Sequence, residues 1–255
     1  MRIDSLFRYP VKGLSAEPLA DVALAQGQGF PRDRAYAVTD GSLRFDPADP
    51  KPAPKIQFLM LAKYESLARL RTRLLQAPDR LEVQDGDAAE TFALDAVGSA
   101  ALAQHLAGVV GVPLPGNPVL VHAPGHQFTD VSVHSVALMR SISLINLDTV
   151  ADLSRHLSMA LDPIRFRANL YFSGVAAWSE LDWVERRLSV GDAVLKVVRR
   201  TRRCAATSVD PSTAVRDVNL PLAIRDYQGH TDLGVYAEVV KGGRIAPGDP
   251  IAFLD

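Results

Sequence analysis

Residues 195–211 read LKVVRRTRRCAATSVDP and hold the only cysteine of the 255-residue chain. The strand-like alternation of LKVV breaks at Arg199, so a β-strand is expected to end or bulge there and to present Cys204 at a rim. Four of the five residues before the cysteine are arginines. Because guanidinium groups lower the pKa of a nearby thiol, the stretch predicts a nucleophile or a soft metal ligand. A small buried hydrophobic residue beside a solvated basic edge remains an open interpretation.

Strand patterns surround this stretch and predict a closed or nearly closed β-barrel decorated by a few helices. The expected strands are FRANLYFSG (166–174), RLSVGDAVLKVVRR (187–200), GVYAEVVKGG (234–243) and the end of RIAPGDPIAFLD (244–255). One amphipathic helix is expected in NLDTVADLSRHLSM (146–159), with Asn146 as its N-cap.

The first half also favours β-structure, with strands in RIDSLFRYPV, DVALAQG and RAYAVTD and a hairpin in LEVQDGDAAETFAL (81–94). Residues 45–55, FDPADPKPAPK, contain four prolines and predict a loop, either a linker or a lid. Residues 58–75 fit a strand followed by a short helix, or one longer helix. A helix near 98–110 ends at Gly111. We therefore expect a mostly β fold with a few helices (α+β), in domains 1–100 and 101–255.

Composition excludes several classes of protein. With 47% hydrophobic residues the chain is globular, and no apolar run reaches the roughly 18 residues of a membrane helix. The start, MRIDSLFRYPVKG, lacks the apolar region of a secretory signal, so a cytoplasmic location without membrane partners is expected. A net charge of −1 argues against a nucleic-acid partner.

Common catalytic signatures are missing from the sequence. No G-x-G-x-x-G, P-loop or G-x-S-x-G motif occurs. One cysteine cannot form an internal disulfide, an iron–sulfur site or a thiolate zinc site. His122 and His126 are separated by Ala-Pro-Gly and cannot share a helical face as a metal pair. Cys204 is therefore the strongest candidate for chemistry.

Two motifs resemble a known family. RCAATSVDPST (203–213) resembles the signature of MOSC domains, named after the C-terminal domain of molybdenum-cofactor sulfurase. RYPVKGLSAEPL (8–19) and GFPRDRAYAV (29–38) resemble the β-barrel domain that precedes MOSC in the mitochondrial amidoxime reducing component and its bacterial relatives. The resemblance implies a MOSC-type β-barrel preceded by a smaller β-rich domain.

The resemblance also implies roles for individual residues. Cys204 matches the molybdenum ligand of a molybdopterin cofactor. The positions that match cofactor contacts are Lys12, Gly13, Arg34, Arg167, Arg203 and Tyr236, with Thr207 and Asp210 as turn positions that orient the site. Of Arg165 and Arg167, placed in one alternating strand, one is expected to point outward. Met139 and Arg140 stand where amidoxime-reducing relatives carry a Thr-Ser contact.

The function implied is a molybdenum-dependent oxidoreductase that reduces N-hydroxylated or other N–O and S–O compounds by oxygen-atom transfer. Its partners would be a small-molecule substrate and a separate ferredoxin-, flavin- or cytochrome-type electron donor. The alternative is a sulfur carrier or cofactor-handling protein with a persulfide on Cys204. A third interpretation is a binding module without catalysis.

Overall fold

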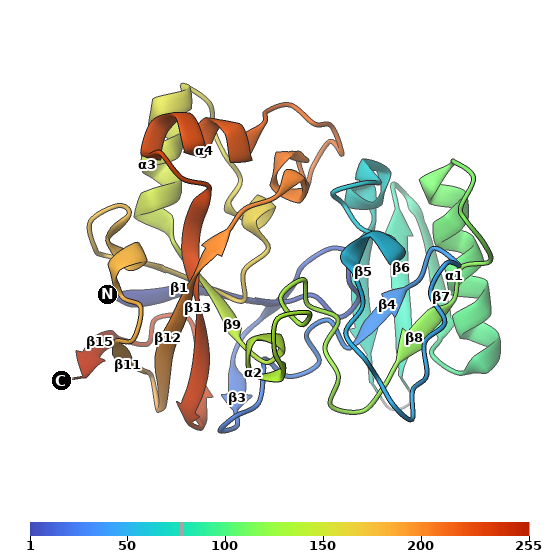
Figure 1. Ribbon diagram of the computed structural model, residues 1–255, viewed down its shortest axis with the longest axis horizontal. Coiled ribbons are helices and arrows are strands. Elements are labelled where there is room, and N and C mark those ends of the chain that lie inside the picture. Colours follow the sequence, from blue (N-terminus) through green and yellow to red (C-terminus); the bar gives the residue numbers. More distant parts are fainter. Residues whose placement is uncertain (77–78, 255) are drawn as a thin grey trace.

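A curled sheet of eight strands dominates one lobe of the computed structural model, which describes residues 1–76 and 79–254 (Figure 1). Its strand order is β15 (Ile251–Leu254), β11 (Arg187–Val190), β12 (Ala193–Arg202), β13 (Asp232–Lys241), β9 (Ile142–Asn146), β10 (Leu170–Ser173), β1 (Arg2–Arg8) and β2 (Glu17–Leu19). Neighbours are antiparallel except β9 and β10. The sheet curls toward closure, and the start of β1 meets the start of β15, where Ile3 N donates to Asp249 O (2.9 Å) and Ile251 N donates to Met1 O (2.9 Å). The nearly closed barrel is confirmed.

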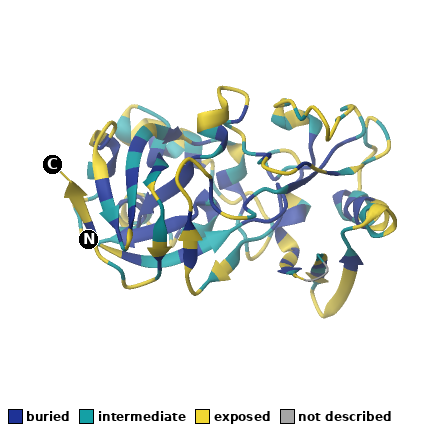
Figure 2. Cartoon of the chain, turned by 90° about the horizontal axis from the view of Figure 1, so that it is seen from below, coloured by how far each residue is buried: buried dark blue, intermediate teal, exposed yellow. Residues whose placement is uncertain are grey.

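Alternation of side chains explains why these segments form a barrel. Along β12, Ala193, Leu195 and Val197 are buried while the residues between them are partly exposed. The inward residues of β1, β9, β10, β12 and β13 form one apolar cluster inside the barrel, and Figure 2 shows buried residues concentrated along these strands. A short pair, β3 (Val22–Leu24) with β14 (Gly243–Ile245), packs on the same cluster.

Two helices cover one end of the barrel (Figure 1). They are α3 (Leu147–Leu157) and α4 (Leu220–Gln228), and they share an apolar cluster with β9, β10 and β13. The Asn146 side chain accepts from Asp148 N (3.0 Å), which confirms the predicted N-cap of α3. A single-turn helix, α2 (Val136–Met139), precedes β9.

The second lobe comprises residues 36–122, with the loop 9–16 packed on it. It contains the antiparallel sheet β5 (Arg71–Leu75), β6 (Arg80–Asp85) and β7 (Ala88–Ala93), the pair β4 (Tyr36–Val38) with β8 (Leu120–His122), and α1 (Ala96–Val110). Its core is separate from that of the barrel and includes Val11 and Leu14 from the loop 9–16. The predicted hairpin and the helix ending at Gly111 in a left-handed conformation are confirmed.

Two expectations about the first half need correction. Residues 58–75 form neither a strand followed by a helix nor one long helix. A short 3₁₀ helix (Glu65–Arg69) comes first and the strand β5 follows, because the alternation of Thr72 and Leu74 decides against helix. Residue 100, the predicted domain boundary, lies inside α1, and β1 pairs with β10. Local alternation predicts a strand but not which sheet it joins.

The fold class is as expected, mostly β with a few helices. Within the described ranges, no helix is long and apolar enough to cross a membrane.

Candidate functional site

A cavity of about 480 Å³ lies where the loops of the second lobe face the barrel, and it contains Cys204. The barrel contributes residues of β9, β12 and β13 together with Arg165–Arg167, and the opposite wall comes from the segments 12–13, 33–34, 55, 60–62 and 128–131. All the predicted site residues except Asp210 line this cavity. The structure therefore brings together side chains from distant parts of the sequence, such as Lys12 and Tyr236.

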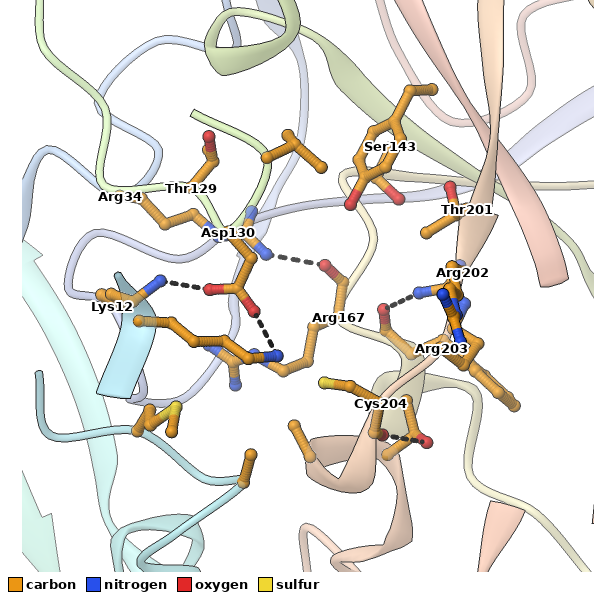
Figure 3. A pocket seen from close by; sticks show the side chains of 18 of the residues that line it. Lys12, Arg34, Thr129, Asp130, Ser143, Arg167, Thr201, Arg202, Arg203 and Cys204 are labelled. Carbon is orange, nitrogen blue, oxygen red and sulfur yellow. Dashed lines mark hydrogen bonds and ion pairs between the residues drawn. The ribbon is translucent and has the colours of Figure 1, made fainter. Parts of the chain in front are cut away.

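Cys204 lies two residues after the end of β12 and directly precedes a 3₁₀ helix, Ala205–Ser208. Its carbonyl oxygen accepts from the Thr207 hydroxyl (2.9 Å) and from Thr207 N (3.0 Å), which fixes the turn. The cysteine is partly buried and unpaired. In Figure 3 its sulfur points into the cavity, toward the side where Asp130 and Lys12 lie. Thr207 thus holds the backbone of the turn that begins at Cys204.

A register shift in β12 changes the direction in which the side chains before Cys204 point. Val197 pairs with Ala237, but Arg199 pairs with the next residue back, Tyr236, so Val198 is an extra residue. A one-residue bulge reverses which side of the sheet the following side chains face. Arg199, which would otherwise lie on the core side with Val197, joins Tyr236 in the lining of the cavity. The predicted bulge is confirmed, and the strand continues to Arg202.

The four arginines before Cys204 do not act alike. Arg203 is buried and donates to the carbonyl oxygens of Leu233 (2.7 Å from Nε) and Phe166 (2.9 Å). Arg200 donates to Leu181 O (2.6 Å) and to Asp182 (2.9 Å). These two guanidinium groups hold backbone rather than a ligand. Arg203, predicted to bind cofactor, is better described as a residue that holds the end of β12 against its neighbours.

Arg199 and Arg202 are different, because both are exposed and both line the cavity. Within residues 1–76 and 79–254, no hydrogen bond or ion pair involves either guanidinium. We call these two residues the rim pair.

On the opposite wall, Asp130 joins two lysines. The Lys12 ammonium forms an ion pair with Asp130 and donates to Phe128 O (3.0 Å), and Lys55 lies 3.4 Å from the other carboxylate oxygen (Figure 3). Burial opposes ionisation of Asp130, but the two lysines outweigh it and lower its pKa to about 2. Burial lowers the pKa of Lys12. Lys12 is 7% exposed, so its charge depends on this carboxylate.

Sequence reasoning missed both Lys55 and Asp130. Burial lowers the pKa of Lys55, but its interactions with Asp130 and Cys204 outweigh burial and raise it. A cation that interacts with Cys204 therefore comes from the proline-rich loop, in addition to Arg203 of the arginine run. The expectation that residues 45–55 form a loop is confirmed. Its contact with the cavity agrees with the lid interpretation at Lys55.

Arg34 and Arg167 meet over one aromatic ring. Their guanidinium carbons lie 4.3 Å and 4.4 Å from the centroid of Tyr9, which is fully buried. Arg34 pairs with Asp33 and donates to Arg167 O (2.8 Å). The Arg167 guanidinium donates no hydrogen bond to any residue in the described part of the chain, and burial lowers its pKa. It is therefore free to take an anionic acceptor.

The strand expected to hold Arg165 and Arg167 begins only at Leu170. Residues Pro163–Phe166 form a 3₁₀ helix started by Asp162 and Pro163, and Arg167 has a left-handed backbone (φ 53°). Neither side chain points to bulk solvent. Arg165 is buried in ion pairs with Asp210 and Asp217 (2.6 Å each). The expected alternation is wrong because the proline favours a turn here.

Gly13 and Asp210 have structural reasons for their identity. Gly13 has φ +85°, and a Cβ there would meet Leu59 O at 2.6 Å, so only glycine lets the backbone follow the cavity wall.

Asp210 lies outside the cavity lining. Its carboxylate accepts from Ser212 N (2.7 Å) and Thr213 N (3.1 Å). Burial raises the pKa of Asp210, but these hydrogen bonds, together with the charge of Arg165, outweigh burial and lower the pKa to about 2. It orients Arg165 and does not reach a ligand.

Polar side chains on the barrel wall form a row across three strands. Ser143 of β9 pairs with Tyr236 of β13, which pairs with Arg199 of β12, and all three line the cavity. Burial raises the pKa of Tyr236. Met139 is buried and Arg140 lies in a different hollow, near His126, so neither replaces the expected Thr-Ser contact. Thr129 and Asp130 line the cavity in that region instead.

Among the described residues, no three histidine, cysteine or acidic side chains gather into a protein-only metal site. Cys204 can give one soft sulfur ligand, and the remaining chemistry of the cavity is that of cations and hydroxyl groups.

Comparisons with known proteins identify similar sequences for part of this chain. Residues 131–252 match the model of the MOSC domain. Mitochondrial amidoxime reducing component 2 of Rattus norvegicus is 33% identical over 122 residues, covering 43% of this chain and 36% of the relative. Molybdenum cofactor sulfurase of Caenorhabditis briggsae is 33% identical over 109 residues, covering 41% of this chain and 15% of the relative. This chain therefore matches about a third or less of the length of these curated relatives.

Solved structures show weaker similarity. The YiiM protein of Geobacillus stearothermophilus gives a TM-score of 0.36 at 19% identity, over 45% of this chain and 54% of that one. The YUAD protein of Bacillus subtilis gives 0.43 at 11% identity, over 98% and 93%. Residues 131–252 are therefore similar to the MOSC domain, and stretches of about 120 residues of this chain are similar to the amidoxime reducing components.

Proposed function

We propose that this protein is a molybdenum-cofactor-dependent oxidoreductase that reduces N-hydroxylated or related N–O and S–O compounds. The observation that carries the proposal is the position of the only cysteine, whose sulfur faces a cavity of about 480 Å³ beside cations without a partner. A cavity of this volume suits a bound cofactor with a small substrate. The curated relatives carry names that contain amidoxime reduction and the molybdenum cofactor, which supports the same class.

The residues present fit a pterin cofactor with a phosphate. Arg167 has no acceptor in the described chain, and its fork of donors suits a phosphate. Arg34 and Lys12 lie on the same side of the cavity, and the backbone at Gly13 leaves room that a Cβ would fill. We assign these four residues to the cofactor phosphate and its surroundings, and Cys204 to the metal.

The chain's own residues set the geometry. Thr207 and Arg203 fix the backbone around Cys204, so its sulfur is held at one position in the cavity. Tyr236 and Ser143 present hydroxyl groups from the sheet toward the same space. When bound, the cofactor would supply the two-electron chemistry at the substrate oxygen. A separate electron donor would restore the reduced state.

A sulfur carrier with a persulfide on Cys204 is the second candidate. The observation in its favour is the match to molybdenum cofactor sulfurase, together with a single, partly exposed thiol. A carrier that releases its sulfur has less need of the cations Lys12, Arg34 and Arg167 and of the close backbone at Gly13, so we prefer stable cofactor binding.

Metal and sulfur analysis separates the two functions. The full chain is expressed in a host that makes the molybdenum cofactor, and molybdenum is measured per chain by mass spectrometry of the metal. We expect molybdenum near one per chain in the wild type and clearly less, but still measurable, in Cys204→Ser, because the variant keeps the proposed phosphate contacts.

Arg225→Gln, an exposed change on α4, is the control and should keep its molybdenum. Persulfide on Cys204 without molybdenum would favour the carrier, and neither molybdenum nor persulfide would contradict both functions.

A further inference from the structure

The cavity carries more positive charge than one phosphate requires. Among its lining residues are nine lysines and arginines but only two carboxylates, Asp33 and Asp130. Both carboxylates are already engaged, Asp33 with Arg34 and Asp130 with Lys12 and Lys55. Outside the lining, Asp210 and Asp217 pair with Arg165, and Asp182 pairs with Arg200. The other lining arginines form no ion pair with the described protein apart from Arg34, so an excess of positive charge remains and the cavity attracts anions.

The cations without a partner fall in two places. Arg167 lies on Tyr9 beside Arg34, where we assign the cofactor phosphate. The rim pair, Arg199 and Arg202, lies on β12, lines the cavity and is exposed. The proposed cofactor contacts leave these two guanidinium groups without a role.

The bulge at Val198 places the first of them in a polar wall. It turns Arg199 from the core side to the cavity side, in line with Tyr236 and Ser143. Thr201 lines the same wall, is 2% exposed, and its hydroxyl has no partner within the described chain. A buried hydroxyl without a partner costs stability, so such a group at a cavity indicates a missing ligand.

We propose that the substrate of this cavity is an anion, whose carboxylate or phosphate is held by Arg199 and Arg202 while its polar body contacts Thr201 and the Ser143–Tyr236 row. This inference rests on the proposed function and names the substrate class of that site. Arginine binds both anions through paired donors, so the shared chemistry is an oxyanion. Both arginines line the cavity that contains Cys204, so an anion bound to them would share this cavity with the sulfur.

The single cysteine offers a direct test on protein made without cofactor. Cys204 is alkylated with iodoacetate, an anion, and with iodoacetamide, its neutral analogue, at one pH. The ratio of the two rates cancels the fraction of thiolate and reports how strongly the cavity attracts an anion. We expect the ratio of the iodoacetate rate to the iodoacetamide rate to be about three- to tenfold higher for Cys204 than for a small uncharged thiol compound in solution. Added salt should lower this ratio.

Arg199→Gln with Arg202→Gln should remove most of the excess that the rim pair contributes, and Arg187→Gln is the matched control. Arg187 is also exposed, lies on the adjacent strand β11 and does not line the cavity. A double variant with the wild-type ratio, or a wild-type ratio equal to that of the free thiol, would overturn the proposal. Failure of both reagents to reach Cys204 would also overturn it.

A second arm ties the rim pair to substrate. With enzyme loaded with the molybdenum cofactor, benzamidoxime is compared with its ring carboxylate. The double variant should raise KM for the carboxylate about fivefold or more and leave KM for the neutral compound unchanged. A changed alkylation ratio with unchanged KM for the carboxylate would mean that the rim attracts some other anion, and the substrate proposal would fall.

The two proposals fail in different ways. A chain that retains no molybdenum contradicts the proposed function, whereas the alkylation ratio still decides whether the rim pair attracts anions to Cys204.

Discussion

The two walls of the cavity both carry positive charge but hold it differently. On the wall from the second lobe and its loops, Lys12 and Lys55 share Asp130. On the barrel wall, Arg200 and Arg203 donate hydrogen bonds to backbone carbonyl groups. The rim pair has no partner in the described chain. The comparison shows that closeness to Cys204 in the sequence does not decide which cation is available to a ligand in the cavity. The direction in which each side chain leaves the strand decides it, because the side chains of one strand alternate between two environments.

The sharpest test of this division compares two adjacent arginines. Arg203→Gln leaves the carbonyl groups of Leu233 and Phe166 buried without their donor, and should lower the free energy of unfolding by about 2 to 4 kcal/mol. Arg202→Gln removes the same charge from an exposed side chain and should change it by less than about 0.5 kcal/mol. Urea unfolding measures both, and equal effects would contradict the division.

A smaller effect is expected on the opposite wall. Asp130→Asn leaves the buried Lys12 without its carboxylate, and we expect a loss of about 1 to 2 kcal/mol, reduced because the Asp130 side chain is 44% exposed. The pKa of Asp130 is lowered to about 2, so its contribution is present above about pH 4 and is lost as pH falls toward 2.

Between pH 6 and pH 2, the free energy of unfolding should therefore fall less steeply in Asp130→Asn than in the wild type. Some decline remains, because Asp210 has its pKa lowered to the same region. Identical acid profiles for the two proteins would show that the pair with Lys12 contributes nothing.

The smallest effect is expected at Lys55. The Lys55 side chain is 34% exposed and its ammonium lies 3.4 Å from Asp130, so Lys55→Gln should cost about 0.5 kcal/mol or less. The same change should nevertheless increase exchange or proteolysis in residues 45–55, since this contact ties the loop to the cavity wall. Limited proteolysis followed by mass spectrometry checks this, and unchanged cleavage would favour the linker interpretation of the loop.

Much of this fold follows from patterns in the sequence, and the exceptions have a common cause. The strands of the barrel, the caps at Asn146 and Gly111 and the bulge after Val197 depend on neighbouring residues, which the sequence shows directly. The pairing of β1 with β10 and the meeting of Lys55 with Asp130 depend on contacts between distant segments. No local pattern specifies such contacts.

The candidate site divides in the same way. The motifs around Lys12, Arg34 and Cys204 were sufficient to predict that these residues share one site, and the structure places them in one cavity. The identity of Arg203 as a backbone clamp and of Asp210 as a partner of Arg165 could not be predicted, because a charged residue in a motif reads the same whether it faces a ligand or a carbonyl group.

The central claim is that the Cys204 sulfur is bound to molybdenum, and X-ray absorption at the molybdenum edge tests it most directly. Protein from a cofactor-producing host is compared with Cys204→Ser, both supplied with the same cofactor. The account predicts one sulfur neighbour of the metal fewer in the serine variant than in the wild type. An equal number of sulfur neighbours in the two proteins would contradict it.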